Sequence, residues 1–327
     1  MLPLRDLNLI MSVPILILLG GLVLILLGAN YLVDGASSIA KKFGLSEFII
    51  GVTIVGIGTS APEMVASIIS AIEGSSQLAI GNIVGSNIFN TLVILGITAL
   101  IAPLLITKSN LKKDIPINIG VTVLLILLGM KATIFGFGTD TLTRLDGAIM
   151  LAIFVWYLWS SFRGDNADDD DSEIKTYPMW LSIIMIAGGL AGLIFGGKLF
   201  VKGAVDIAQA SGMSEKFIGI TIMAAGTSMP ELATCVVAAL KGRGQLALGN
   251  ILGSNISNIL LILGTTALIQ PLSLDGISFI DLSLVAISAI FIFFSAFLFR
   301  KNELDRVEAT ILLLIEAGYM WYLIANL

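Results

Sequence analysis

Apolar residues in this chain gather in long runs that short polar stretches separate. Ten runs are long enough to cross a membrane, because a hydrocarbon core of about 30 Å needs about 20 mostly apolar residues in a helix. They cover residues 12–33, 48–72, 77–103, 115–136, 143–162, 179–200, 214–240, 245–270, 277–299 and 307–326. The pattern predicts an all-α membrane protein with ten transmembrane helices.

The second half of the chain repeats the first at a distance of 168 residues. The segment GVTIVGIGTSAPEMVASIISAIEGSSQLAIGNIVGSNIFN, residues 51–90, and the segment GITIMAAGTSMPELATCVVAALKGRGQLALGNILGSNISN, residues 219–258, share 21 of 40 positions without a gap. The closing spans also match at a slightly different distance, with Tyr157 answering Tyr319. The closest identity falls on polar residues, which favours a shared site over a duplication kept only for stability.

Each half holds five predicted spans, and five is an odd number. The second half must therefore enter the membrane with the opposite orientation, as in the inverted repeats of secondary transporters, whose substrate site lies between the repeats. We predict a first five-helix repeat over 1–162, an acidic cytoplasmic linker over 163–178 and a second repeat over 179–327.

The composition agrees with a membrane protein and excludes several functions. Hydrophobic residues make up 57% of the chain and charged residues 13%, against about 25% charged in a soluble domain. There are 18 basic and 23 acidic residues, no His and one Cys, Cys235. Histidine-centred catalysis, His-ligated zinc and an internal disulfide are therefore excluded, and nothing indicates a nucleic-acid partner.

The basic residues predict the orientation, because cytoplasmic loops carry an excess of Lys and Arg. With the N-terminus outside, twelve of them fall on the cytoplasmic side and six outside or near the outer interface. We therefore expect a multi-pass protein of the cell membrane with both termini extracellular. The twelve are Lys41, Lys42, Lys108, Lys112, Lys113, Arg163, Lys175, Lys241, Arg243, Arg300, Lys301 and Arg306.

Polar residues interrupt the second span and, at matching places, the seventh. They are Thr59, Ser60, Pro62 and Glu63 in the first repeat and Thr227, Ser228, Pro230 and Glu231 in the second. A charge at the bilayer centre costs at least about 2.5–3.5 kcal/mol on insertion scales, and such residues are usually functional. The two glutamates would also repel each other unless a cation compensates or one is protonated.

The two prolines add oxygen ligands at the same depth. Proline lacks an amide hydrogen, so Pro62 and Pro230 release the carbonyls of Gly58 and Gly226 four residues earlier. Unpaired backbone oxygen is tolerated inside a membrane only where it is buried in protein or lines a cavity. Carbonyl, hydroxyl and carboxylate oxygens are the ligands that Ca²⁺ prefers, whereas zinc, copper and iron sites usually use His or Cys.

The third and eighth spans open with GNIVGSNIFN and GNILGSNISN. Ser86 and Asn90 are four residues apart and share a helix face, as do Ser254 and Asn258. Packing between helices is the alternative interpretation of these small and amide residues. Their repetition beside a buried glutamate favours ion binding.

These motifs resemble the paired α-repeats of the sodium/calcium exchanger family, in the cation/Ca²⁺ exchanger superfamily, and the chain looks like a prokaryotic ten-helix member. The resemblance covers the whole chain and implies Na⁺/Ca²⁺ exchange by alternating access, with the glycine-rich first and sixth spans moving as a pair. It implies Ca²⁺ binding by Glu63, Glu231, Thr59 and Thr227. For Na⁺ it implies these four together with Ser60, Ser228, Ser86, Ser254, Gly56 and Ala224.

The charges at the site bear on the transported ions. Asn90 and Asn258 are expected to be supporting polar residues, and because K⁺-dependent relatives have Asp at the position of Asn258, K⁺ dependence is not expected. One Ca²⁺ or two Na⁺ neutralise the two glutamates, and any further Na⁺ would make the exchange sensitive to membrane potential. We expect electrogenic export of Ca²⁺.

Three other functions of a membrane protein are Ca²⁺/H⁺ exchange, passive cation conduction and intramembrane hydrolysis. Ca²⁺/H⁺ exchange stays open as the alternative, because protonation of Glu63 and Glu231 could replace Na⁺, although the chain lacks the second-helix signature of the Ca²⁺/H⁺ branch. The inverted halves argue against a passive channel. An intramembrane hydrolase is disfavoured because no His or Lys base accompanies Ser60, so no enzyme activity is expected.

Few further partners are expected. The acidic run at 165–173 lacks an EF-hand pattern and is interpreted as a solvated linker rather than a Ca²⁺ sensor. Glu316 lies in the middle of the last span and is a possible accessory to the site. We expect Ca²⁺, Na⁺ and the lipid bilayer as the only partners, no cofactor, and a functional monomer.

Overall fold

The computed structural model describes residues 4–136, 138–163, 174–211, 213, 224–274, 277–298 and 300–325. These residues are mostly helical, with four two-residue strands among them. The acidic run at 165–173 lies outside the described residues.

Helices of the first half follow one another with short breaks, several of which are π-helical turns (η). The elements are α1 (Leu4–Phe43), α2 (Glu47–Ile50), η1 (Gly51–Val55), α3 (Gly56–Thr59), α4 (Ala61–Ile72), α5 (Ser76–Phe89), η2 (Asn90–Ile94), α6 (Leu95–Ile101), β1 (Leu104–Leu105), η3 (Asn110–Asp114), α7 (Ile115–Gly129), α8 (Lys131–Phe135), β2 (Thr141–Leu142) and α9 (Arg144–Arg163).

The second half has a similar order of elements. They are α10 (Met179–Ala210), α12 (Ala224–Thr227), α13 (Met229–Leu240), α14 (Gly244–Ser257), η5 (Asn258–Leu263), α15 (Gly264–Ile269), β3 (Leu272–Ser273), α16 (Phe279–Ser295), β4 (Glu303–Leu304) and α17 (Arg306–Ala325). Helical turns cover each of the predicted apolar runs within the described residues.

Five continuous helices in the described part of the chain are long and apolar enough to cross a membrane. They are Ser12–Phe43, Ser76–Ile101, Arg144–Arg163, Met179–Ala210 and Gly244–Ile269. A sixth is the helix pair Glu47–Thr59 and Ala61–Ile72, which bends by 45° at the break between its two parts. The other predicted spans fall on shorter or broken helices, so the chain is a multi-span helical protein and the exact number of crossings stays a prediction.

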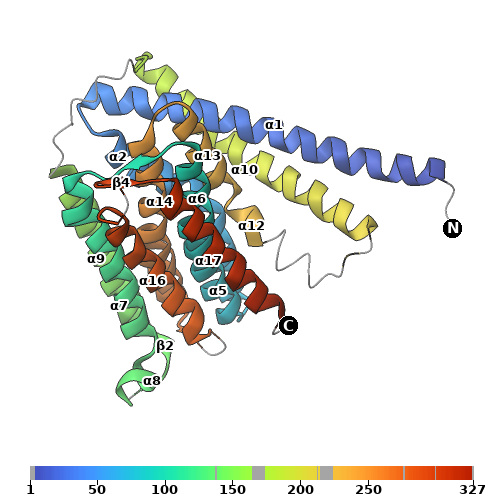
Figure 1. The fold of residues 1–327 in the computed structure, drawn as a ribbon. Coiled ribbons are helices and arrows are strands. Elements are labelled where there is room, and N and C mark those ends of the chain that lie inside the picture. Colours follow the sequence, from blue (N-terminus) through green and yellow to red (C-terminus); the bar gives the residue numbers. More distant parts are fainter. Residues whose placement is uncertain are drawn as a thin grey trace.

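Helices α1 and α10 lie side by side and project beyond the remaining helices, as Figure 1 shows. Glycines make their contact close. A Cβ atom on Gly28 would lie 2.7 Å from the Gly189 carbonyl oxygen, and one on Gly196 would lie 2.8 Å from the Ile25 amide nitrogen. The smooth faces predicted for the first and sixth spans are therefore packed against each other.

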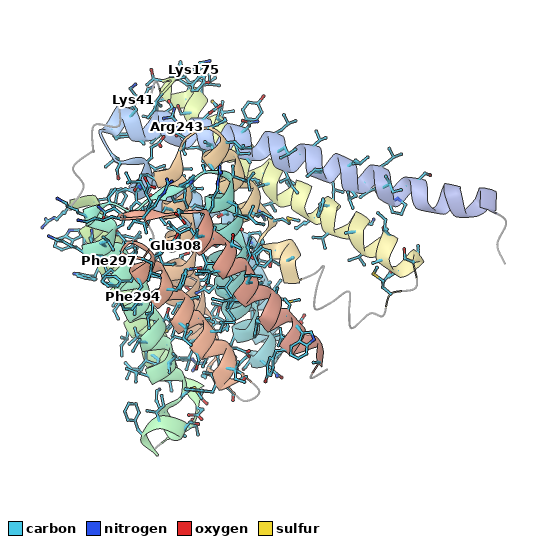
Figure 2. All side chains as sticks on the ribbon, viewed as in Figure 1. Lys41, Lys175, Arg243, Phe294, Phe297 and Glu308 are labelled. Atoms are coloured by element: carbon cyan, nitrogen blue, oxygen red, sulfur yellow. The ribbon has the colours of Figure 1, made fainter. Side chains whose placement is uncertain are left out.

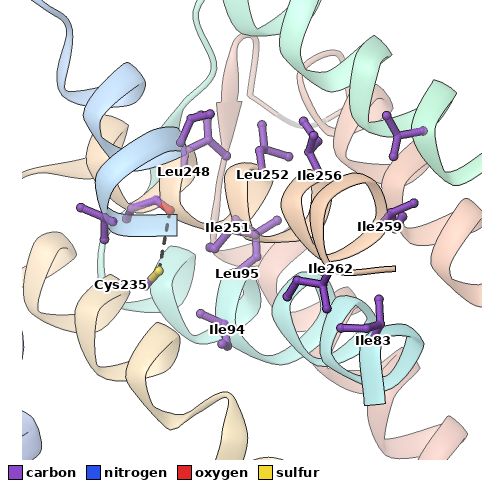
Figure 3. Close-up of a cluster of buried hydrophobic side chains, with 14 of the residues drawn as sticks. Ile83, Ile94, Leu95, Cys235, Leu248, Ile251, Leu252, Ile256, Ile259 and Ile262 are labelled. Atoms are coloured by element: carbon purple, nitrogen blue, oxygen red, sulfur yellow. Dashed lines mark hydrogen bonds between the residues drawn. The ribbon is translucent and has the colours of Figure 1, made fainter. Parts of the chain in front are cut away.

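The helix α14 forms the centre of the remaining bundle. In the most apolar 18-residue window of Gly244–Ile269, which comprises α14, η5 and α15, 94% of the residues are buried, compared with 28% for the window of Ser12–Phe43 in α1. Figure 3 shows Leu252, Ile256 and Ile259 of this segment packed near Ile83 and Leu95 of the first half. The two halves thus share one hydrophobic core.

Short strands tie each half to the other in a reciprocal way. Strand β1 pairs antiparallel with β4, and β2 pairs antiparallel with β3. In Figure 1 β4 lies near one end of the helix bundle and β2 at the opposite end. Two arginines also connect the halves. Arg144 donates to the Leu268 carbonyl at 3.1 Å, and Arg306 donates to the Leu100 carbonyl at 3.2 Å.

Basic residues gather at one end of the molecule, where Figure 2 labels Lys41, Lys175 and Arg243. Two ion pairs there join α1 and α2 to the turn between α13 and α14. Lys241 Nζ lies 2.6 Å from Asp34 Oδ1, and Arg243 Nε lies 3.5 Å from Glu47 Oε1. This end is where the sequence predicts the cytoplasmic surface.

Substituting Gly28 with Ala should destabilise the protein, because the added methyl group would overlap the backbone of α10. We expect a loss of about 1–3 kcal/mol in the free energy of unfolding, as for other overpacked sites. The matched control is Gly20→Ala in the same helix, where no described atom lies within 4 Å of the new Cβ. Thermal unfolding in detergent measures both variants, and equal melting temperatures for the two would contradict this packing.

Candidate ion-binding site

Both intramembrane glutamates lie in the first turn of a helix that starts at a break. Ser60 and Ser228 precede α4 and α13, and each helix has a proline at its start and Glu63 or Glu231 in the first turn. Proline fits this position because the first amides of a helix have no internal partner. A carboxylate there is also favoured by the helix dipole. The same local sequence therefore delivers each acid to the start of a half-helix.

The two glutamates are buried close to each other and are held across the two halves. Glu63 is 1% exposed and Glu231 0%, and they are near enough for their charges to interact. The Ser60 hydroxyl donates to Glu231 Oε1 at 3.1 Å, and the Ser228 hydroxyl donates to Glu63 Oε1 at 3.5 Å. Each carboxylate thus receives a hydroxyl from the opposite half.

The two threonines of the motifs also contact the glutamate of the opposite half. The Thr227 hydroxyl lies beside the Glu63 carboxylate and the Thr59 hydroxyl beside the Glu231 carboxylate. Thr59 is 0% exposed, whereas Thr227 is half-buried. The crossed arrangement of Ser and Thr around the two acids could not be read from the repeat, which is equally compatible with contacts inside each half.

One oxygen of each carboxylate has no hydrogen-bond partner among the described residues. These atoms are Glu63 Oε2 and Glu231 Oε2, both buried. A buried carboxylate oxygen without a partner is strongly unfavourable in a low-dielectric interior. The pair is therefore an incomplete arrangement that a cation or protons would complete.

Three of the remaining predicted ligands lie in the same group of polar atoms. The Ser86 hydroxyl is 3.4 Å from the Ser228 hydroxyl, and the Ser254 hydroxyl donates to the Gly56 carbonyl at 3.2 Å. The Thr59 hydroxyl is also 3.4 Å from the Gly56 carbonyl. Ala224 begins α12, but its side chain lies outside the described residues.

Asn90 and Asn258 lie one helical turn beyond these serines, where π-helical turns η2 and η5 begin. The Asn90 amide donates to Asn255 Oδ1 at 3.2 Å, and the Asn258 amide donates to Asn87 Oδ1 at 3.0 Å. The Oδ1 atoms of Asn90 and Asn258 are buried and have no partner among the described residues. These bonds direct the amide nitrogen toward the opposite half and leave the oxygen available.

Several residues in this network had no assigned role in the sequence. Asn255 bonds to Thr91 Oγ1 at 2.9 Å, and Asn87 donates to the Asn255 carbonyl at 3.2 Å. Asn250 lies 3.3 Å from the Thr59 hydroxyl. The three asparagines belong to the repeated motif GNIxGSNIxN, whereas Thr91 follows it directly. Spacing alone does not distinguish an ion ligand from a residue that joins the halves.

The site combines two carboxylates, those of Glu63 and Glu231, with neutral oxygen atoms. No group of three or more His, Cys, Asp or Glu side chains suited to a metal occurs in the described part of the chain. The other oxygens around the glutamates come from hydroxyl, amide and carbonyl groups. Such a set is neutral apart from the two carboxylates and consists of the hard oxygen ligands that suit Na⁺ and Ca²⁺.

Comparison with known proteins identifies the family. The model of the sodium/calcium exchanger protein family matches residues 13–163 and 181–325. The chain belongs to the sodium/calcium exchanger family. Members of this family are membrane transporters that exchange cations for Ca²⁺, so the chain is an antiporter and not an enzyme.

Two relatives of this exchanger match over nearly their whole length. CaxA from Alkalimonas amylolytica is 39% identical over 327 residues, covering 97% of this chain and 100% of the relative. The sodium/calcium exchanger MaX1 from Methanosarcina acetivorans is 33% identical, covering 94% of this chain and 98% of MaX1. A solved structure of the sodium-calcium exchanger NCX_Mj superposes with a TM-score of 0.82 at 30% identity, covering 95% of this chain and 98% of that one.

The exchanger should lose stability when Asn255 is replaced by Leu. The change removes the acceptor for Asn90 and the donor to Thr91, and leaving buried polar groups unpaired costs about 1–3 kcal/mol. A suitable control is Ser257→Ala, since the Ser257 hydroxyl bonds to the Ser254 carbonyl of its own helix at 3.1 Å. Melting temperatures in detergent, without Ca²⁺, test this, and a loss no larger than that of the control would argue against the cross-half network.

Proposed function

We propose that this exchanger is a secondary active antiporter that exports Ca²⁺ in exchange for Na⁺ by alternating access. The observation that supports this most directly is that Glu63 Oε2 and Glu231 Oε2 are buried and have no hydrogen-bond partner among the residues that the structure describes. Two carboxylates this close require positive charge between them in a membrane interior. One Ca²⁺ or two Na⁺ would supply it, which makes the two ions competitors for one site.

The proposed Ca²⁺ ligands are Glu63, Glu231 and the Thr59 and Thr227 residues. For Na⁺ we propose the same residues with Ser60, Ser228, Ser86, Ser254 and the backbone of Gly56 and Ala224, while Asn90 and Asn258 support the site. The hydroxyl contacts between the halves support this assignment, because they place neutral oxygen atoms around both carboxylates. No resident cofactor is needed for such exchange.

The proposed architecture has ten transmembrane helices in two inverted repeats, 1–162 and 179–327, joined by the linker 163–178. The reciprocal strand pairs support this, because equivalent pairs lie at opposite ends of the bundle in Figure 1. With an inverted repeat, the half-helices α4 and α13 would point at the site from opposite sides. The basic end would be cytoplasmic and both termini extracellular.

Alternating access in this proposal comes from helices α1 and α10. Their glycine-lined contact with each other makes them a closely packed pair, which we propose moves over the central bundle as one body. Leu190 of α10 contacts the position of Gly58, next to Thr59, since a Cβ there would lie 2.9 Å from Leu190 Cδ2. Movement of the pair would thus change access to the site. A single chain contains both acids, so we propose a functional monomer.

Replacing Glu63 or Glu231 with Gln should each abolish Ca²⁺ transport, because one carboxylate cannot neutralise a divalent ion in the membrane. Uptake of radioactive Ca²⁺ into Na⁺-loaded proteoliposomes should fall to the level of empty vesicles, with expression unchanged. The matched control is Glu73→Gln, an exposed glutamate just beyond the end of α4, which should transport like the unmodified protein. Normal uptake by either site variant would overturn the assignment.

The coupling ion is tested in the same vesicles by changing only the outward gradient. We expect Ca²⁺ uptake with a Na⁺ gradient and none with a K⁺ or H⁺ gradient. Uptake driven by a pH gradient instead would establish Ca²⁺/H⁺ exchange, with Glu63 and Glu231 carrying protons in place of Na⁺.

Exchange should respond to membrane potential, because more than two Na⁺ per Ca²⁺ moves net charge. The effect of a potential on one moved charge is about 2.3 kcal/mol per 100 mV. Clamping the vesicles with K⁺ and valinomycin at different potentials should change the initial rate of Na⁺-driven Ca²⁺ uptake in a graded way. A rate independent of potential would show neutral exchange.

A further inference from the structure

Asn250 of α14 is a buried residue beside the ion site that the proposed function does not use. Its side chain is 0% exposed. The side-chain oxygen Oδ1 accepts from the Thr59 hydroxyl of the first half at 3.3 Å, and the amide nitrogen Nδ2 donates to the Cys235 sulfur at 3.2 Å. Asn250 therefore connects a proposed ion ligand to the interior of the second half.

The Cys235 thiol decides which end of the Asn250 amide faces Thr59. Cys235 is 0% exposed, and its thiol donates to the Ala247 carbonyl at 3.7 Å (Figure 3). Because the thiol hydrogen is used there, the sulfur is left to accept a hydrogen bond from Asn250. The amide nitrogen must then face Cys235, and the amide oxygen faces Thr59.

The first half contains the same chain of bonds with oxygen in place of sulfur. At positions 168 residues earlier, Asn82 donates to the Ser67 hydroxyl at 3.0 Å, and Ser67 donates to the Ala79 carbonyl at 3.2 Å. The Asn82 nitrogen also donates to the Glu63 carbonyl at 3.2 Å. Both halves thus turn the nitrogen of this asparagine toward their own helices, which supports the orientation of Asn250.

The Thr59 hydroxyl has one hydrogen to donate and two acceptors within reach. They are Asn250 Oδ1 at 3.3 Å and the Gly56 carbonyl at 3.4 Å. The Gly56 carbonyl already accepts from the Ser254 hydroxyl at 3.2 Å. Of the residues that the structure describes, only Thr59 donates to Asn250 Oδ1, and a buried amide oxygen normally has a donor. The Thr59 hydrogen is therefore assigned to Asn250.

The direction of this hydrogen matters for ion binding, because a cation binds a hydroxyl through the lone pairs of its oxygen. With its hydrogen on Asn250, Thr59 Oγ1 keeps lone pairs beside the Gly56 carbonyl and the Ser254 hydroxyl. The hydrogen-bond distances place these three oxygens in one group. The proposed function assigns Gly56 and Ser254 to Na⁺ and not to Ca²⁺.

We propose that Asn250 is a positioning residue for Na⁺, which takes the hydrogen of the Thr59 hydroxyl and so keeps Thr59 Oγ1 as a Na⁺ ligand. Asn250 itself does not touch the ion. This inference rests on the proposed function, since it requires Thr59, Gly56 and Ser254 to bind Na⁺. Ca²⁺ depends less on Asn250, because the two glutamates supply the charge that binds a divalent ion.

The test measures radioactive Ca²⁺ bound to the purified full chain in detergent, and its displacement by NaCl with choline chloride keeping the ionic strength constant. In Asn250→Leu the Thr59 hydrogen would turn to the Gly56 carbonyl and occupy a second proposed Na⁺ ligand. Na⁺ affinity should fall about tenfold, as when other residues that orient a metal ligand are lost. Ca²⁺ affinity without Na⁺ should change little. An unchanged Na⁺ affinity, or an equal loss for both ions, would overturn the inference.

A double-mutant cycle separates positioning from a general loss of structure. Thr59→Val should itself lower Na⁺ affinity. In that background Asn250→Leu should cause no further loss, because no hydroxyl is left to orient. Additive losses would show that Asn250 does not act through Thr59. Should Asn250→Leu fail to fold, Asn250→Ser takes its place in the cycle, since it removes the same amide and keeps a polar side chain.

Two controls complete the experiment. Cys235→Ser installs the residue of the first half and should preserve Na⁺ affinity, because a hydroxyl can replace the thiol in the chain of bonds. Thr266→Val should do the same, since the buried Thr266 hydroxyl bonds to the Ile262 carbonyl one turn earlier at 2.7 Å. A loss in either control as large as that of Asn250→Leu would refute the inference. Unmodified protein whose bound Ca²⁺ is not displaced by Na⁺ would instead refute the proposed function, and the inference with it.

Discussion

The site of this exchanger depends on two hydrogen bonds between its halves, in which each buried glutamate accepts from a serine of the opposite half. Ser60 donates to one oxygen of Glu231 and Ser228 donates to one oxygen of Glu63, and the second oxygen of each acid has no hydrogen-bond partner in the part of the chain that the structure describes. Two carboxylates in a low-dielectric interior repel each other and lack hydration. Neither half alone contains both acids with their serine partners, so the arrangement forms only where the two halves meet.

The surrounding elements differ in how firmly they are held. The segment of α14 and η5 is almost fully buried and provides Ser254 and Asn258, while the asparagine bonds between the halves join it to α5. The helices α1 and α10 lie at the periphery and pack closely on each other at their glycines. A buried centre with a separate peripheral helix pair suits a transporter, because the ligands must keep their geometry while access to them changes.

Buried polar groups in this chain fall into two classes. Most of the asparagine network is satisfied by bonds between the halves, and it contributes neutral oxygen without adding charge to the two glutamates. Elsewhere, Asn118, Tyr157 and Ser161 each have a buried polar atom without a hydrogen-bond partner among the described residues, whereas Tyr319 donates to Asp281 Oδ1 at 2.8 Å.

The sequence by itself determined the helical membrane fold and the family, because ten apolar runs and the doubled GTSxPE and GNIxGSN motifs are local properties of the chain. The sequence placed Pro62 and Pro230 inside two spans, and only the structure shows that each proline and the following glutamate begin a new helix. Only the tertiary structure decided that Ser60 serves Glu231 rather than Glu63, and that Asn87 and Asn255 bond across the halves. Those contacts depend on how two similar segments cross in space, and two equal copies of a motif carry no information about which copy each one faces.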